Sequence, residues 1–176
     1  MRRSLAALSL LAAGASAAAV MNADPCNATD ANQLWQVNAT HGSATHQLAV
    51  VAPGGGERCA AVTVAADSCA VLDFAFVSTA ACAPATCALA QGFDVLEAAT
   101  GLPAPAGRAC AKCIVRSRLN SSLCFGVGAE LGGVAWKVSA ADAGGRQTLQ
   151  MIGAFEPLCL ASGFETSAYP ISLQEC

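Results

Sequence analysis

The sequence predicts an all-β fold that is built from three repeats and stapled by disulfides. Short apolar or alternating segments bounded by glycine, proline and asparagine dominate the chain after its first twenty residues, with little helical periodicity. Short strands separated by regular turns are typical of sandwiches and barrels. The order cysteine, large aromatic, cysteine occurs three times along the chain, which indicates an internal repeat. Ten cysteines in 176 residues point to an oxidising compartment.

The charge of the chain excludes two broad classes of protein. Only 12% of its residues are charged, and its formal net charge is −3. A low charge content argues against a disordered polyelectrolyte. Seven arginines and two lysines never form a run longer than two, so the chain lacks the basic tract that nucleic acids attract.

The first residues predict a signal peptide that covers residues 1–17. Arg2 and Arg3 precede a short apolar stretch, and Ala15-Ser16-Ala17 offers an A-x-A cleavage site. The stretch is short for a membrane-spanning helix. We therefore expect a secreted, extracellular protein without membrane insertion after cleavage, although a retained N-terminal anchor is the alternative. Three N-glycosylation sequons agree with this route, at Asn27, Asn38 and Asn120.

The mature domain is expected to span residues 24–176, in repeats of about 26–81, 82–123 and 124–176. In each repeat a large aromatic follows the first cysteine by nine to twelve residues: Trp35, Phe93 and Trp136. Around Asp73, the alternation of Leu72, Phe74 and Phe76 predicts a half-buried strand with the carboxylate on the opposite face. The expected strands, in chain order, include 47–51, 62–64, 71–77, 148–152 and 171–174.

Residues 25–35, with the sequence PCNATDANQLW, resemble the cysteine-to-tryptophan stretch of ricin B-type lectin domains. That family carries a Gln-x-Trp motif in each repeat. The second repeat has Phe in place of Trp, and the third keeps Trp without the Gln. The segments 158–160 and 171–176 are similar to the family's Cys-Leu strand and closing strand. The motif residues are Gln33 and Trp35, Gln91 and Phe93, and Trp136.

The resemblance implies a β-trefoil of three four-stranded units. In such a fold the motif aromatics pack in the core and the motif glutamines hydrogen-bond to backbone within their repeat. The family's pairing of the Cys-Leu cysteine with the next strand's cysteine implies three bridges: Cys59–Cys82, Cys159–Cys176, and Cys124 with Cys113 or Cys110. The pairing of the other four cysteines stays open: Cys26, Cys69, Cys87 and whichever of Cys110 and Cys113 remains.

The motif Cys110-Ala111-Lys112-Cys113 has two other interpretations. A redox motif is expected at a helix start near a βαβ unit, and a zinc site needs a second cysteine pair at metal spacing. No βαβ pattern is present, and Cys82 with Cys87 is only a loosely spaced partner for a zinc site, so disulfides are favoured and no metal or cofactor is expected. His41 and His46 lie in a polar loop without a third ligand nearby, which favours solvated side chains.

The resemblance also implies binding to glycans or glycoproteins, but the family's acidic site residues are replaced. The position two residues after the Cys-Leu cysteine holds Ala61, Lys112 or Val115, and Ala161. Tyr169 is the aromatic at a plausible sugar-stacking position. Asp30 and Asp73 are the acidic candidates that complete the predicted carbohydrate site: Tyr169, Asp30 and Asp73.

No catalytic motif is visible in the sequence. Asp94 and Glu97 are the closest carboxylates of the mature chain, and nothing marks them as an acid and base pair. The leading hypothesis is a secreted carbohydrate-binding module without catalytic activity. One alternative is a degenerate trefoil that binds protein or forms an accessory or N-terminal part of a secreted hydrolase. Another is a cysteine-rich surface or matrix protein without a trefoil.

Overall fold

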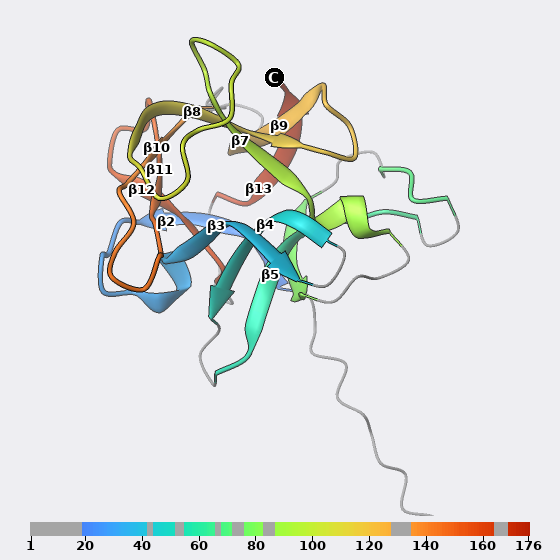
Figure 1. Ribbon diagram of the computed structural model, residues 1–176, viewed down its shortest axis with the longest axis horizontal. Coiled ribbons are helices and arrows are strands. Elements are labelled where there is room, and N and C mark those ends of the chain that lie inside the picture. The colour runs from blue at the N-terminus through green and yellow to red at the C-terminus, as the bar shows by residue number, and fades with distance from the viewer. Residues whose placement is uncertain are drawn as a thin grey trace, which may run out of the picture.

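A computed structural model describes most of the chain beyond its first eighteen residues (Figure 1). The signal peptide predicted at 1–17 and the candidate site residue Asp73 lie outside the described residues. The described ranges are 19–41, 44–51, 55–65, 68–71, 76–82, 87–127, 135–163 and 169–176.

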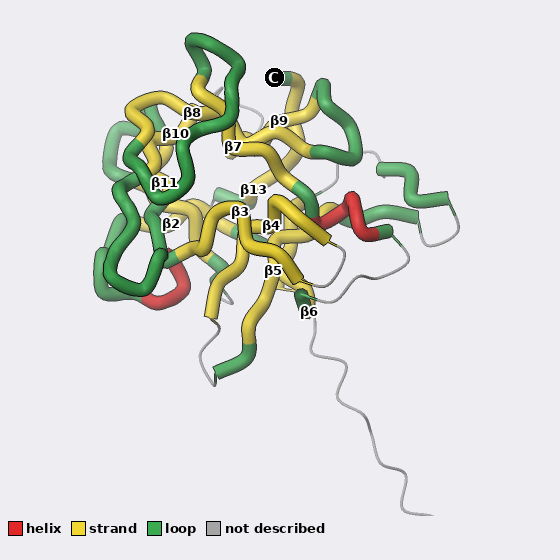
Figure 2. Tube along the Cα trace, viewed as in Figure 1, coloured by secondary structure: helices red, strands yellow, loops and turns green. Residues whose placement is uncertain are grey.

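Strands make up almost all of the regular structure of these ranges, as predicted for an all-β protein (Figure 2). Two single-turn 3-10 helices, η1 and η2, are the helical elements of the described chain. The elements in chain order are β1 (Ala19–Val20), β2 (Asn22–Pro25), η1 (Ala31–Gln33), β3 (Trp35–His41), β4 (Ala44–Val51), β5 (Glu57–Val62), β6 (Val77–Ala81), η2 (Ala88–Gln91), β7 (Phe93–Glu97), β8 (Cys110–Ser117), β9 (Leu123–Val127), β10 (Ala135–Val138), β11 (Leu149–Met151), β12 (Leu158–Ala161) and β13 (Ile171–Glu175).

The strands form two curled antiparallel sheets that share one core. The first sheet has the order β1-β6-β5-β4-β3, and the second has the order β13-β9-β8-β10-β11-β12-β2 with β7 paired to β8. Bridges at Trp35↔Gln147 and Phe76↔Ser172 join the two sheets. The N-terminal β2 therefore lies beside the late strand β12, which the bar colours of Figure 1 place side by side as blue and orange.

The three motif aromatics lie at the centre of this core. Trp35, Phe93 and Trp136 are fully buried, and Phe93 meets Phe125 edge-to-face with ring centroids 4.7 Å apart. Large aromatics bury more apolar area than any other side chain, which matters in a chain whose strands are rich in alanine. These rings are therefore core residues and not ligand platforms.

Two of the predicted repeats share one local construction. Each has a 3-10 helix immediately before its aromatic strand, and each has a glutamine whose Nε2 donates to the carbonyl that precedes a cysteine. Gln33 donates to Pro25 O at 3.0 Å, and Gln91 donates to Ala81 O at 3.0 Å. The third aromatic, without a motif glutamine, donates its indole Nε1 to Phe125 O at 3.4 Å.

The five disulfides correct the pairings that the resemblance implies. Cys59 and Cys82 are bonded, as expected, with Cα atoms 5.0 Å apart. Cys159 is not bonded to Cys176 but to Cys26, because β2 rather than β13 pairs with β12. Cys69 and Cys87, whose partners the sequence left open, are bonded to each other.

The expected bond between Cys113 and Cys124 is also absent. β13 pairs with β9 in a register that sets Gln174 opposite Cys124. Cys176, two residues further along the chain, therefore comes within bonding distance of Cys124. Their Cα atoms are 5.1 Å apart. Cys113 is bonded instead to Cys110 within the same strand.

A β-bulge makes the bond between Cys110 and Cys113 possible. Residues three apart on a regular strand point to opposite faces, so their sulfurs cannot meet. Here Ala111 and Lys112 of β8 together face the single residue Lys137 of β10. The extra residue lets Cys110 and Cys113 both point into the core, while Ala111 and Lys112 both point outward.

The disulfides are expected to differ sharply in what they contribute to stability. In the loop-entropy model the long closure between Cys26 and Cys159, separated by 133 residues, is worth about 5 kcal/mol. The closure between Cys110 and Cys113, separated by 3 residues, is worth about 2 kcal/mol. We expect the Cys26→Ala/Cys159→Ala variant to lose far more unfolding free energy in urea than the Cys110→Ala/Cys113→Ala variant. Equal losses would contradict this account.

Candidate functional site

The loop between β11 and β12 carries the most exposed large apolar side chain of the described residues. Phe155 is fully exposed, although burial of a phenylalanine is worth about 1.5–3 kcal/mol. Gly153 turns the loop with a φ of 97°, a conformation that suits glycine, and Pro157 ends the loop at the start of β12. A turn held in this way presents the ring to solvent, where it is available for a ligand.

Tyr169 lies beside Phe155 and shares a hollow with it. The hollow has a volume of about 190 Å³ and is lined by Ala154, Phe155, Glu156, Leu158 and Tyr169. The Tyr169 ring is half-buried and packs against the core, so its position is fixed. The structure thus brings the predicted aromatic together with a second aromatic and a carboxylate.

Hydrogen bonds from β2 and from the residue after it fix the two chain segments that line this hollow. Ala23 N donates to the Tyr169 carbonyl at 2.9 Å, and Cys26 N donates to the Pro157 carbonyl at 2.9 Å. The Cys26–Cys159 disulfide fastens the same strand to β12. The hollow is lined by residues 154–158 and Tyr169, and the N-terminal strand holds both of these segments in place.

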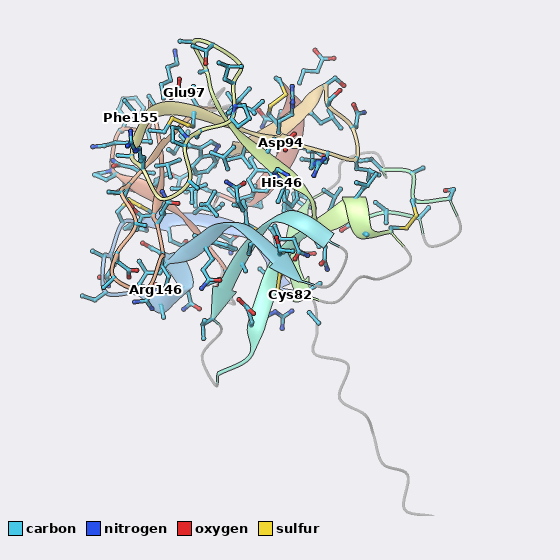
Figure 3. The ribbon with its side chains drawn as sticks, in the orientation of Figure 1. His46, Cys82, Asp94, Glu97, Arg146 and Phe155 are labelled. Carbon is cyan, nitrogen blue, oxygen red and sulfur yellow. A yellow bond between two sulfur atoms is a disulfide. The ribbon has the colours of Figure 1, made fainter. Side chains whose placement is uncertain are left out.

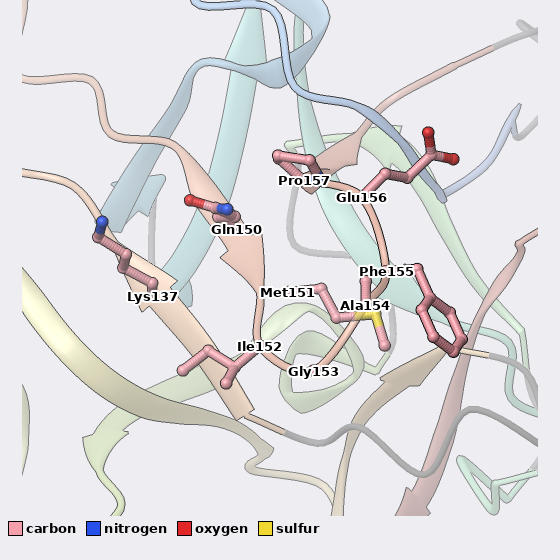
Figure 4. Close-up of a pocket in the computed structure, with 9 residues that line it drawn as sticks. All are labelled: Lys137, Gln150, Met151, Ile152, Gly153, Ala154, Phe155, Glu156 and Pro157. Atoms are coloured by element: carbon pink, nitrogen blue, oxygen red, sulfur yellow. The ribbon is translucent and has the colours of Figure 1, made fainter.

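A second and larger hollow lies on the other side of the same loop (Figure 4). It has a volume of about 320 Å³, and it shares Ala154, Phe155 and Glu156 with the first hollow. Lys137 of β10 and Gln150 of β11, which are directly opposite each other in the register, contribute its polar groups. Its floor is apolar, with Met151, Ile152 and Pro157.

The two hollows together have the chemistry of a shallow site for a polar ligand with apolar faces. Aromatic rings offer flat apolar surfaces against which the C–H face of a sugar ring can stack. The Glu156 carboxylate accepts hydrogen bonds only, whereas the Gln150 amide both donates and accepts. Such a mixture of aromatic surface and a few placed polar groups is typical of small-ligand sites.

Asp30, the predicted acidic residue of the carbohydrate site that the structure describes, has a structural role. Asp30 is the N-cap of η1, and its Oδ1 accepts a hydrogen bond from Asn32 N at 2.9 Å. Asp30 lines neither hollow. Sequence analysis missed Phe155 and Glu156, because a single aromatic in a turn-rich loop carries no periodic signal. The flanking Gly153 and Pro157 were the available sign of a fixed turn.

The positions at which the resemblance implies an acidic residue hold no acid, and most of them are buried. Ala61 and Ala161 are buried in β5 and β12, and Val115 is fully buried in β8. Lys112 is exposed at the bulge. None of these side chains can accept a hydrogen bond from a sugar hydroxyl.

Asp94 forms a separate charged cluster on the outer face of β7 and β8. Its carboxylate lies 3.5 Å from Arg116 Nη2, 3.7 Å from Arg118 Nε and 3.5 Å from His46 Nδ1. Figure 3 shows Asp94 and His46 next to each other and Phe155 at a distant edge of the molecule. The cluster ties β4 to β7 and β8, and its carboxylate is already engaged.

Asp94 and Glu97 do not form a carboxylate pair. Both pair with β8 in a regular register, so residues three apart on β7 point to opposite faces of the sheet. Glu97 Oε2 accepts a hydrogen bond from Thr100 Oγ1 at 3.3 Å. Within the described residues, no group of three or more His, Cys, Asp and Glu side chains could hold a metal ion.

The three sequons differ in local geometry. Asn27 Oδ1 accepts from Thr29 Oγ1 at 2.8 Å, and Asn120 Oδ1 accepts from Ser122 Oγ at 2.8 Å, both in exposed turns. Asn38 lies within β3, is half-buried and has a φ of 62°. The two turn sequons offer more room for a glycan than the strand sequon does.

Comparison of the chain with protein-family models, with characterised proteins and with solved structures gave no match. In the described part of the chain, no helix is long and apolar enough to cross a membrane.

The turn at Asp142 gives a pH-dependent readout of local structure. The pKa of Asp142 is lowered, first by the backbone N–H of Arg146 and then by the Arg146 guanidinium, whose Nη2 lies 2.9 Å from Oδ2. Because the folded pKa is depressed, the turn's stabilisation is complete above the unfolded pKa and is lost as pH falls through the folded pKa. Carboxyl carbon NMR should report a titration below that of an unstructured aspartate. Arg146→Gln should move it upward, and an unmoved midpoint would contradict the assignment.

Proposed function

We propose that this chain is a secreted carbohydrate-binding module of β-trefoil fold, without catalytic activity of its own, and that it binds glycans at Phe155 and Tyr169. The observation that carries the proposal is the hollow shared by these two rings and the Glu156 carboxylate. One fully exposed ring and one fixed ring provide the stacking surface, and the carboxylate provides the acceptor for sugar hydroxyls.

The trefoil part of the proposal is supported by the core and by the resemblance to ricin B-type lectins. Three buried aromatics converge from three segments of similar length, and two of those segments share the glutamine-to-carbonyl contact before a cysteine. The sheets are antiparallel, curled and joined around one core. Fold alone does not fix function, so the glycan assignment depends on the site.

Secretion is supported by the chemistry of the cysteines. All ten are paired in five disulfides, two of which close loops of more than fifty residues. Disulfides of this density persist in oxidising compartments and are rare where glutathione keeps thiols reduced. The exposed sequon turns at Asn27 and Asn120 agree with passage through that route.

A protein-binding role, or a role as an accessory part of a secreted hydrolase, is the second candidate. The fully exposed Phe155 favours it, since single aromatic anchors often dominate protein interfaces. The hollows beside that ring favour a ligand smaller than a protein surface, because a stable protein interface covers about 800 Å² on each partner.

The proposal is tested by screening the purified mature protein on an immobilised glycan array with free sugar as competitor. We expect competable binding that Phe155→Ala and Tyr169→Ala each weaken by about tenfold, which corresponds to about 1.4 kcal/mol of lost stacking and apolar contact. Because Tyr169 also packs against the core, Tyr169→Phe is measured beside it and should retain most of the binding.

Leu102→Ala is the matched control, since Leu102 is 63% exposed on a loop that lines neither hollow. Its affinity should equal that of the unmodified protein. The absence of competable binding to any glycan at high protein concentration would overturn the proposal and direct the search to protein partners.

A further inference from the structure

Both lysines of the chain lie on one outer face without a partner. Lys112 on β8 and Lys137 on β10 are exposed, and they are the two lysines of the whole sequence. Within the described residues, neither makes an ion pair or a hydrogen bond through its ammonium group. The described ion pairs instead involve His46, Arg116, Arg118 and Arg146.

The β-bulge brings the two lysines together. Lys137 lies opposite the two bulge residues, Ala111 and Lys112. The pattern of buried and exposed residues on both strands directs the side chains of Lys112 and Lys137 outward. Adjacent strands lie about 4.8 Å apart and like charges on opposed residues repel each other, so an anion bound between the two lysines would relieve this repulsion. The Cys110–Cys113 bond, which requires the bulge, thereby fixes a paired positive charge on this face.

One lysine of this pair, Lys137, lines the larger hollow, and Lys112 lies beside it across the strand pair. Lys137 and its cross-strand neighbour Gln150 line the hollow, and Figure 4 shows their side chains on one side of it with the Phe155 ring at the other. An ammonium group and an amide N–H are both donors that an anion accepts from. Phe155 lines both hollows, so the aromatic surface of the first hollow adjoins the second hollow, which Lys137 lines.

Negative charge near the lysines is sparse. Glu97 lies opposite Cys113, which points inward, and its carboxylate accepts from Thr100. Across the sheet, Lys137 lies opposite Gln150, Gln150 opposite Cys159, and Cys159 opposite Asp24. Asp24 is therefore three strands away from Lys137, or about 14 Å. At that distance exposed charges are largely screened. Glu156 is the remaining carboxylate at the hollow, on the loop that separates the two sites.

We infer that the larger hollow binds an anionic substituent, a carboxylate or a sulfate ester, of the glycan whose apolar face rests on Phe155 and Tyr169. The ligand is thus an acidic glycan rather than a neutral one. This inference rests on the proposed function, and it names the substrate class of the same site.

The test is an array on which each neutral glycan is printed beside its uronate and its sulfated counterpart of the same linkage. The ratio of acidic to neutral affinity is measured for each set. We expect the ratio to exceed about five for at least one acidic form and to fall as sodium chloride rises from about 50 to 500 mM, because exposed charges are screened by salt. A preference for the uronate identifies a carboxylate ligand, and a preference for the sulfated form identifies a sulfate ester.

Three variants separate the lysine pair from net charge. Lys112→Gln/Lys137→Gln should reduce the ratio at least about fivefold while neutral glycans still bind. Arg108→Gln removes a positive charge from an exposed side chain that lines neither hollow, and should leave the ratio unchanged. Glu156→Gln removes the nearby negative charge and should raise the ratio.

The outcomes distinguish failure of the acidic-glycan inference from failure of the proposed carbohydrate-binding function. Equal binding of neutral and acidic forms, or an acidic preference that the double lysine variant leaves intact, would overturn the inference while the carbohydrate-binding function stands. The absence of binding to every glycan would overturn both.

Discussion

The pairing of β2 with β12 is the contact on which the rest of the structure depends. It joins residues more than a hundred positions apart, and the Cys26–Cys159 bond makes the closure covalent. The Trp35 indole Nε1 donates to the Leu160 carbonyl at 2.9 Å across the same junction, so the largest core side chain is oriented by it. The same strand donates to the Tyr169 and Pro157 carbonyls, which links closure of the domain directly to the shape of the candidate site.

The composition of the chain explains why so much depends on covalent and aromatic contacts. Strands with alanine at buried positions, such as β5, bury little apolar area per residue, and the free energy of apolar burial scales with area. Three large rings and five disulfides compensate for this weak core. The bond between Cys110 and Cys113 contributes least to this compensation, because it closes only a short loop. The bulge that this bond requires also sets Lys112 beside Lys137.

The sequence predicts what depends on local pattern and fails where tertiary pairing decides. The burial of Trp35, Phe93 and Trp136 and the backbone contacts of Gln33 and Gln91 follow from motifs of a few residues. The disulfides of β12 and β13 depend on which strand lies next to each, and that choice is made by contacts over the whole chain. A pairing rule that assumes each repeat closes on its own following strand therefore bonds Cys159 to Cys176, whereas the structure bonds them to Cys26 and Cys124.

The candidate site was predicted only in part for the same reason. Tyr169 could be proposed from its place before a closing strand, but Phe155 and Glu156 join it through a loop whose position β2 fixes. At the positions where the resemblance implies an acidic residue, the buried Ala61, Ala161 and Val115 offer no hydrogen-bond acceptor in their side chains. A loop is free to supply the missing groups because its side chains are not constrained by the core. In the proposed site, recognition therefore depends on a turn held between glycine and proline and on the lysines that a bulge turns outward, while the strands supply the packing.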